Sequence, residues 1–117
     1  MDQDRSFPEP GKAEYLYSDE HFLTCLQNAP KRYIRDVVRN SIIKYFNDPK
    51  DGPWIRQQLS RILDYQDQLG NLPVVVRGMP KAEYKARKNR ERDYNEIIVG
   101  LWNHLAHDWR QRHLGIL

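Results

Sequence analysis

The chain has 117 residues, of which 39% are hydrophobic and 30% charged, and its only cysteine is Cys25. This length suits one domain, and the composition excludes a disordered chain, an intramolecular disulfide framework and a bilayer-spanning helix. The formal net charge of +3 is unevenly divided, with −4 on the first 29 residues and +7 on the remaining 88. An acidic beginning therefore precedes a basic body.

Residues 1–17 mix prolines, a glycine and acidic side chains without helical or strand periodicity. We expect an acidic flexible tail here, disordered or loosely docked through Tyr15 or Tyr17, and a single helical domain over 18–117. The first residues lack the basic and apolar parts of a signal peptide, and one cysteine cannot form an internal bridge. These features favour a cytoplasmic protein.

Apolar residues recur at steps of three and four along most of the remaining chain. Four helices are predicted, at about 19–28, 31–46, 53–69 and 80–113, and the first three begin after Ser18, Pro30 and Gly52. The β-branched segment at 72–80 reads as an extended connector, because a lone strand has no partner for its backbone groups. The fold class is therefore all-α, a small bundle of three to four helices with a long C-terminal helix. The expected core comprises Val37, Val38, Ile42, Phe46, Ile55, Leu59, Ile62, Leu63, Ile98, Leu101, Trp102 and Leu105.

The last predicted helix is charged in its first half and periodically apolar in its second half. It would be about 50 Å long if straight, at about 1.5 Å per residue, which exceeds the width of a small domain. Gly100 interrupts the apolar half, and we expect a bend or a close helix contact at this position.

Six basic residues within twelve positions open this helix: Lys81, Lys85, Arg87, Lys88, Arg90 and Arg92. Four of them, Lys81, Lys85, Lys88 and Arg92, are spaced by 4, 3 and 4 residues, and we call them the basic stripe. Residues at these spacings share one side of a helix and can neutralise successive phosphates. The alternative is a solvated face with local ion pairs such as Glu83 with Arg87.

A second basic surface is predicted on the helix at 31–46. Arg32, Arg35 and Arg39 share a side that differs from the apolar one. The two basic surfaces form one patch only if tertiary packing brings them together.

Three histidines and an aspartate lie near the C-terminus, at His104, His107, His113 and Asp108. Two imidazoles and a carboxylate are a minimal metal ligand set, but no fourth ligand or supporting shell accompanies them, so we expect no metal site. The doublet His107-Asp108 is similar to that of the helical HD phosphohydrolases. Those enzymes add an upstream histidine and a downstream aspartate, and no aspartate follows Asp108 here.

No P-loop, glycine-rich dinucleotide fingerprint or nucleophile elbow occurs, and the carboxylates are scattered among basic residues. We therefore expect a non-catalytic protein without a cofactor. The first hypothesis is a regulatory or accessory protein that binds nucleic acid, DNA or RNA, through phosphate contacts. The second is an adaptor or inhibitor that binds a partner protein through the acidic tail and exposed aromatic residues. A bacteriophage or mobile element is a suitable source for either.

Self-association is the last expectation from the sequence. Apolar residues between 94 and 109 cover more of the helix circumference than a small monomer would use. We predict a homodimer whose interface contains Ile97, Leu101, Trp102, Leu105 and Trp109.

Overall fold

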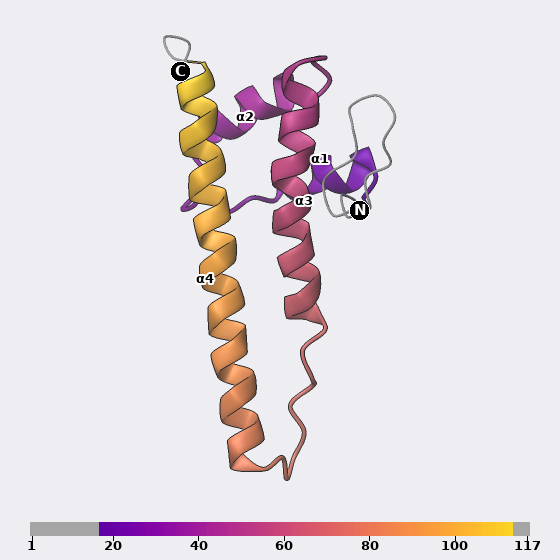
Figure 1. Cartoon of the computed structure of the whole chain (residues 1–117), viewed down its shortest axis with the longest axis vertical. Coiled ribbons are helices and arrows are strands. Elements are labelled where there is room, and N and C mark those ends of the chain that lie inside the picture. The colour runs from indigo at the N-terminus through magenta and orange to yellow at the C-terminus, as the bar shows by residue number, and fades with distance from the viewer. Residues whose placement is uncertain (1–16, 114–117) are drawn as a thin grey trace, which may run out of the picture.

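A computed structural model describes residues 17–113, and within this range the chain forms four α-helices and no β-strand (Figure 1). The helices are α1 (Asp19–Gln27), α2 (Asp36–Lys44), α3 (Asp51–Gly70) and α4 (Lys81–Arg112). The all-α prediction with a long C-terminal helix is confirmed. The predicted tail lies outside the described residues, except for Tyr17.

The long helices α3 and α4 lie side by side and antiparallel, and they form the axis of the molecule (Figure 1). The short helix α1 packs against α3, and α2 packs against α4 near its C-terminal end (Figure 1). The first part of α4 and the connector that precedes it extend away from this body at the other end (Figure 1). No helix within the described range is long and apolar enough to span a bilayer.

One hydrophobic core joins the four helices. Most of the predicted core residues are buried or packed against it, including Trp102 and Leu105. The prediction that Val37 lies in the core is wrong, since this residue is 52% exposed. The core also contains residues of α1, of the segment between α1 and α2 and of the end of α4: Phe22, Leu26, Ala29, Ile34, Ala106 and Trp109.

The second helix begins later than predicted. We expected it to start after Pro30, but only one turn forms there, in which the Pro30 carbonyl accepts bonds from the Tyr33 and Ile34 amides at 2.9 and 3.2 Å. Arg35 then has extended backbone, with φ −72° and ψ 153°, and α2 starts at Asp36. The break lets Ile34 enter the core, where it is 2% exposed. Burial of this side chain therefore overrides the local preference for a helix after proline.

The start of α3 depends on a close backbone approach at Gly52. A Cβ atom at this position would lie 2.6 Å from the Phe46 carbonyl oxygen, so a larger residue does not fit. The Asp48 carboxylate accepts bonds from the Lys50 and Asp51 amides at 2.9 and 2.8 Å. These amides would otherwise lack partners at the helix start, and the bonds lower the pKa of the Asp48 carboxyl.

The helix α4 continues through Gly100 without interruption. A Cβ atom placed there would meet no atom within 4 Å, so the predicted close helix contact is absent. This glycine faces open space.

Candidate nucleic-acid interface

The N-terminal part of α4 projects beyond the body of the protein. The rings of Tyr65 in α3 and Tyr94 in α4 pack with centroids 6.0 Å apart. Beyond this contact α3 has only five further residues, whereas α4 has 13 on its N-terminal side, so about two turns of α4 pass the end of α3. We call residues 71–92 the arm (Figure 1).

The arm is held together by contacts between the connector and α4. The Arg87 guanidinium donates through Nε to the Pro73 carbonyl and through Nη1 to Glu91, at 3.1 Å for the second bond. Leu72 and Met79 of the connector are half-buried. Arg87 is therefore a structural residue of the arm, and its predicted role at the nucleic-acid surface competes with these bonds.

The arm carries seven basic residues and two acidic ones, and it contains no acidic residue between 71 and 82. All four residues of the basic stripe are exposed, as is Arg90 on another side of the helix. The stripe lies about 120° around the helix from the buried Ile98. Its side chains therefore contribute nothing to the core and are available to a partner.

Acidic neighbours hold the stripe only weakly. Lys88 lies 4.0 Å from Glu91, and Arg92 lies 3.5 Å from Asp93, with all four side chains more than a third exposed. Exposed pairs of this kind contribute about 0 to 1 kcal/mol and weaken with salt. A ligand phosphate can replace either carboxylate at small cost.

The second predicted basic surface lies elsewhere on the molecule. Arg39 is mostly buried and pairs with Asp36 at 3.3 Å, and Arg32 covers the Tyr33 ring at 4.7 Å. The exposed Arg35 is the residue before α2. The turn before α2 and Trp102 of α4 line the same hollow, which is described below. Trp102 is ten residues, or about 15 Å, from Arg92 along α4. The second basic surface, formed by Arg32, Arg35 and Arg39, is therefore separate from the arm.

Three of the five residues predicted at a dimer interface are inside the monomer. Trp102, Leu105 and Trp109 are each no more than 1% exposed, because α2 and α3 cover this side of α4. The Trp109 indole also donates to the Ser41 hydroxyl at 2.9 Å. Ile97 and Leu101 keep some exposed surface. Most of the apolar surface on which the dimer prediction rested is therefore buried in the core of the monomer.

The histidines near the C-terminus contact different partners. His104 pairs with Asp108 at 2.8 Å on the surface. His113 lies 3.1 Å from the buried Asp51, which also accepts a bond from Arg112 at 2.5 Å. Within the described part of the chain, no three His, Cys, Asp or Glu side chains are grouped closely enough to hold a metal ion.

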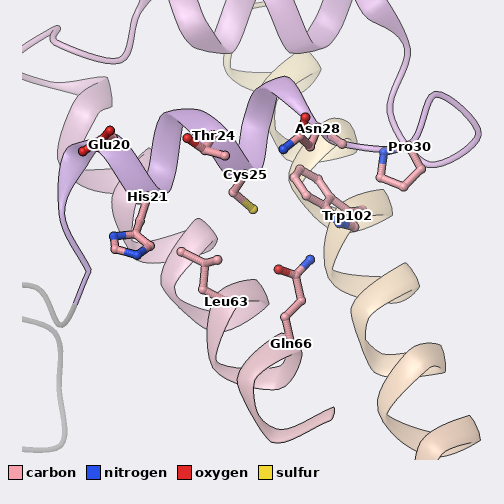
Figure 2. Close-up of a pocket in the computed structure, with 10 residues that line it drawn as sticks. Glu20, His21, Thr24, Cys25, Asn28, Pro30, Leu63, Gln66 and Trp102 are labelled. Atoms are coloured by element: carbon pink, nitrogen blue, oxygen red, sulfur yellow. The ribbon is translucent and has the colours of Figure 1, made fainter. Parts of the chain in front are cut away.

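A hollow of about 530 Å³ lies between α1, α3 and α4, and Figure 2 shows its lining. The Cys25 thiol points from α1 toward Leu63 and Gln66 of α3 (Figure 2). Burial raises the pKa of this thiol to about 12, so it is not a thiolate at neutral pH. The hollow has neither an activated nucleophile nor a charged cluster.

The connector contributes a feature that the sequence analysis did not identify as a site. Val74, Val75 and Val76 are 77%, 47% and 57% exposed at the free end of the arm. We call these three residues the valine tip. The signal was present in the sequence, as three β-branched apolar residues in a connector with no predicted strand to pair with.

Comparison of the chain with known protein families, with curated proteins and with solved structures finds no match. The arm combines the exposed basic stripe, the exposed Tyr84 ring and the exposed valine tip. Its exposed ammonium and guanidinium groups are suited to binding phosphates without any bond-breaking chemistry.

Proposed function

We propose that the protein binds nucleic acid through phosphate contacts made by the arm and acts as a non-catalytic accessory or regulatory protein. One observation carries this proposal. The first turns of α4 bury no side chain in the core, yet they place the four exposed residues of the basic stripe along one side. The stripe can therefore contact a ligand without disturbing the core.

The length of the stripe fits a polyanion. From Lys81 to Arg92 it extends about 16 Å along the axis, so a single small anion cannot occupy it. A chain of phosphates can, and each neutralised phosphate releases counterions, which favours binding at low salt. The surplus of five positive charges on the arm draws such a ligand toward this end of the molecule.

Partner-protein binding through an acidic tail and exposed aromatic residues has less support. Among the described Phe, Tyr and Trp residues, only Tyr84 is exposed. Tyr84 itself lies in the arm, where the Lys88 ammonium is 6.0 Å from its ring centroid. Tyr84 therefore adds support to the nucleic-acid proposal, since an exposed ring beside basic residues can pack against a base or sugar.

The test compares two variants with equal loss of charge. The first removes Lys85, Lys88 and Arg92 from the arm, and the control removes three exposed basic residues from the other end, Lys44, Lys50 and Arg110. Binding to a fluorescent duplex of about 25 base pairs at low salt measures both. We expect the arm variant to lose at least about tenfold in affinity and the control to lose much less. Equal losses would show that only net charge matters and would contradict the proposal.

A further inference from the structure

Tyr84 places an exposed aromatic ring beside the basic stripe. It is 41% exposed, whereas the other described Phe, Tyr and Trp residues are buried or half-buried. It lies three residues after Lys81 and four before Lys88, so all three residues are neighbours on one side of α4. The Lys88 ammonium is 6.0 Å from the ring centroid, at the outer limit of a cation–π contact. A flat group of a ligand can therefore replace this contact at small cost.

The positive charge beside Tyr84 forms a single line. At about 100° per residue, the four residues of the basic stripe lie within about 60° of one another around the helix. Glu91 lies about 100° to one side of Arg92, and Asp93 lies about 100° to the other side. Carboxylates on both sides disfavour a second row of phosphates. The stripe therefore matches one strand of a nucleic acid.

A hollow continues the stripe toward the body of the protein. It has a volume of about 500 Å³ and begins at the last two residues of the stripe. Its lining comprises Lys88, Glu91, Arg92, Asn95, Glu96 and Val99. Val99 is half-buried, and the exposed Asn95 amide can both donate and accept hydrogen bonds. This side of α4 therefore offers space and hydrogen-bonding groups to a base as well as cations to a phosphate.

A duplex and a single strand present different groups to this surface. In a duplex the faces of the bases are stacked on one another, so a protein contacts the phosphates and the base edges in the grooves. In a single strand, unstacked bases can lie on aromatic side chains while basic residues follow the backbone. Only the single strand therefore gives both the Tyr84 ring and the basic stripe a partner.

We propose that the arm binds single-stranded nucleic acid, with an unpaired base stacked on the Tyr84 ring and the neighbouring phosphates on the basic stripe. This inference rests on the proposed function and names the form of nucleic acid that the arm prefers. A duplex can still bind through its phosphates, but it lacks the stacking contribution. Truncation of a stacking ring to alanine weakens single-strand binding about 5- to 150-fold.

The test compares Tyr84→Ala with Tyr84→Phe, which keeps a ring, and with the control Ile97→Ala. Ile97 is 39% exposed, a value close to that of Tyr84, but it lies on another side of α4. None of these changes alters the net charge, so the phosphate contacts stay the same. Affinity is measured at one low salt concentration for a single strand of about 12 nucleotides and for a duplex of about 12 base pairs. Thermal midpoints should stay close to that of the wild type, because both side chains are exposed.

We expect the wild type to bind the single strand at least about fivefold more tightly than the duplex. Tyr84→Ala should lose this preference and keep its duplex affinity, while Tyr84→Phe and Ile97→Ala should keep both affinities. Irradiation of a bound single strand that contains 5-iodouracil should crosslink it to Tyr84.

Two kinds of failure are distinguishable. Equal or tighter wild-type binding to the duplex, an unchanged preference in Tyr84→Ala, or crosslinks confined to residues outside the arm would overturn the stacking inference and leave phosphate binding standing. Absence of binding to either nucleic acid at low salt would reject the proposed function as well.

Discussion

The Arg87 side chain in α4 donates a hydrogen bond from Nε to the backbone carbonyl of Pro73, fourteen residues earlier in the chain. The bond ties the connector to the helix at a place where α3 no longer supports either of them (Figure 1). The same guanidinium reaches Glu91 one turn further along α4. One basic residue of the arm thus links the connector to α4, while the four residues of the basic stripe lie outside the core.

Replacing Arg87 with Ala should loosen the arm and leave the body intact. The Pro73 carbonyl loses its partner, so local opening of residues 81–92 becomes easier without a global loss of packing. Hydrogen exchange should show faster exchange across this segment, with the thermal midpoint nearly unchanged. Arg90→Ala, which changes an exposed residue of the same helix, is the matched control. Equal exchange in both variants would show that the bond to Pro73 does not stabilise the arm.

Two glycine substitutions should change stability in opposite directions. Ala at Gly52 would place its Cβ 2.6 Å from the Phe46 carbonyl oxygen, and the resulting shift should cost about 1 to 3 kcal/mol. Ala at Gly100 meets nothing within 4 Å in the middle of α4 and should stabilise the fold by up to about 1 kcal/mol. Urea denaturation measures both. Stabilisation by Gly52→Ala would mean that the start of α3 is looser than described.

The buried carboxylate of Asp51 should matter more than the exposed one of Asp108. Asp51 is 7% exposed and binds both Arg112 and His113, so it joins the first turn of α3 to the end of α4. Asp51→Asn should lower the free energy of unfolding by about 1 to 3 kcal/mol, because the partly buried Arg112 guanidinium loses its charged acceptor. Asp108→Asn breaks only a surface pair with His104 and should cost less than about 1 kcal/mol. Comparable losses on chemical denaturation would contradict the difference in burial.

The ion pair of Asp19 and Arg56 should make part of the stability depend on pH. Arg56 holds the pKa of the Asp19 carboxyl below its usual value, mainly through their hydrogen bonds at 3.0 and 3.1 Å. A carboxyl with a lower pKa in the folded state stabilises the fold above its unfolded pKa of about 3.9 and loses this contribution as the pH falls. The difference in unfolding free energy between the wild type and Asp19→Asn should therefore shrink between about pH 6 and about pH 3. A difference that is constant over this range would show that the pair adds no stability.

Periodicity in the sequence was sufficient to predict the helices, since α1, α3 and α4 begin and end within two residues of the predicted positions. The start of α2 was wrong because the burial of Ile34 is a tertiary effect that proline placement does not reveal. The same reason explains Trp109, which was predicted at an interface and lies in the core. Which neighbour covers an apolar side of a helix is decided by packing over long sequence distances, here by Ser41 and its helix α2.

Part of the candidate site could be predicted from the sequence. The spacing of the basic stripe follows from the sequence alone, and all four of its residues are exposed in the structure. The sequence did not reveal that this stripe would project beyond α3, because that depends on the register in which the two long helices pack, with Tyr65 beside Tyr94. It also did not reveal that the valine tip would lie at the free end.

The salt dependence of duplex DNA binding tests the central claim most directly. Each phosphate neutralised by the protein contributes about −0.9 to the slope of log K against log salt concentration, so the four residues of the basic stripe predict a wild-type slope of about −3.6 or steeper. Changing Lys85, Lys88 and Arg92 to Ala should flatten this slope by about 2.7, whereas changing Lys44, Lys50 and Arg110 should leave it nearly as it was. A slope that is the same in the wild type and the arm variant would contradict phosphate binding by the arm.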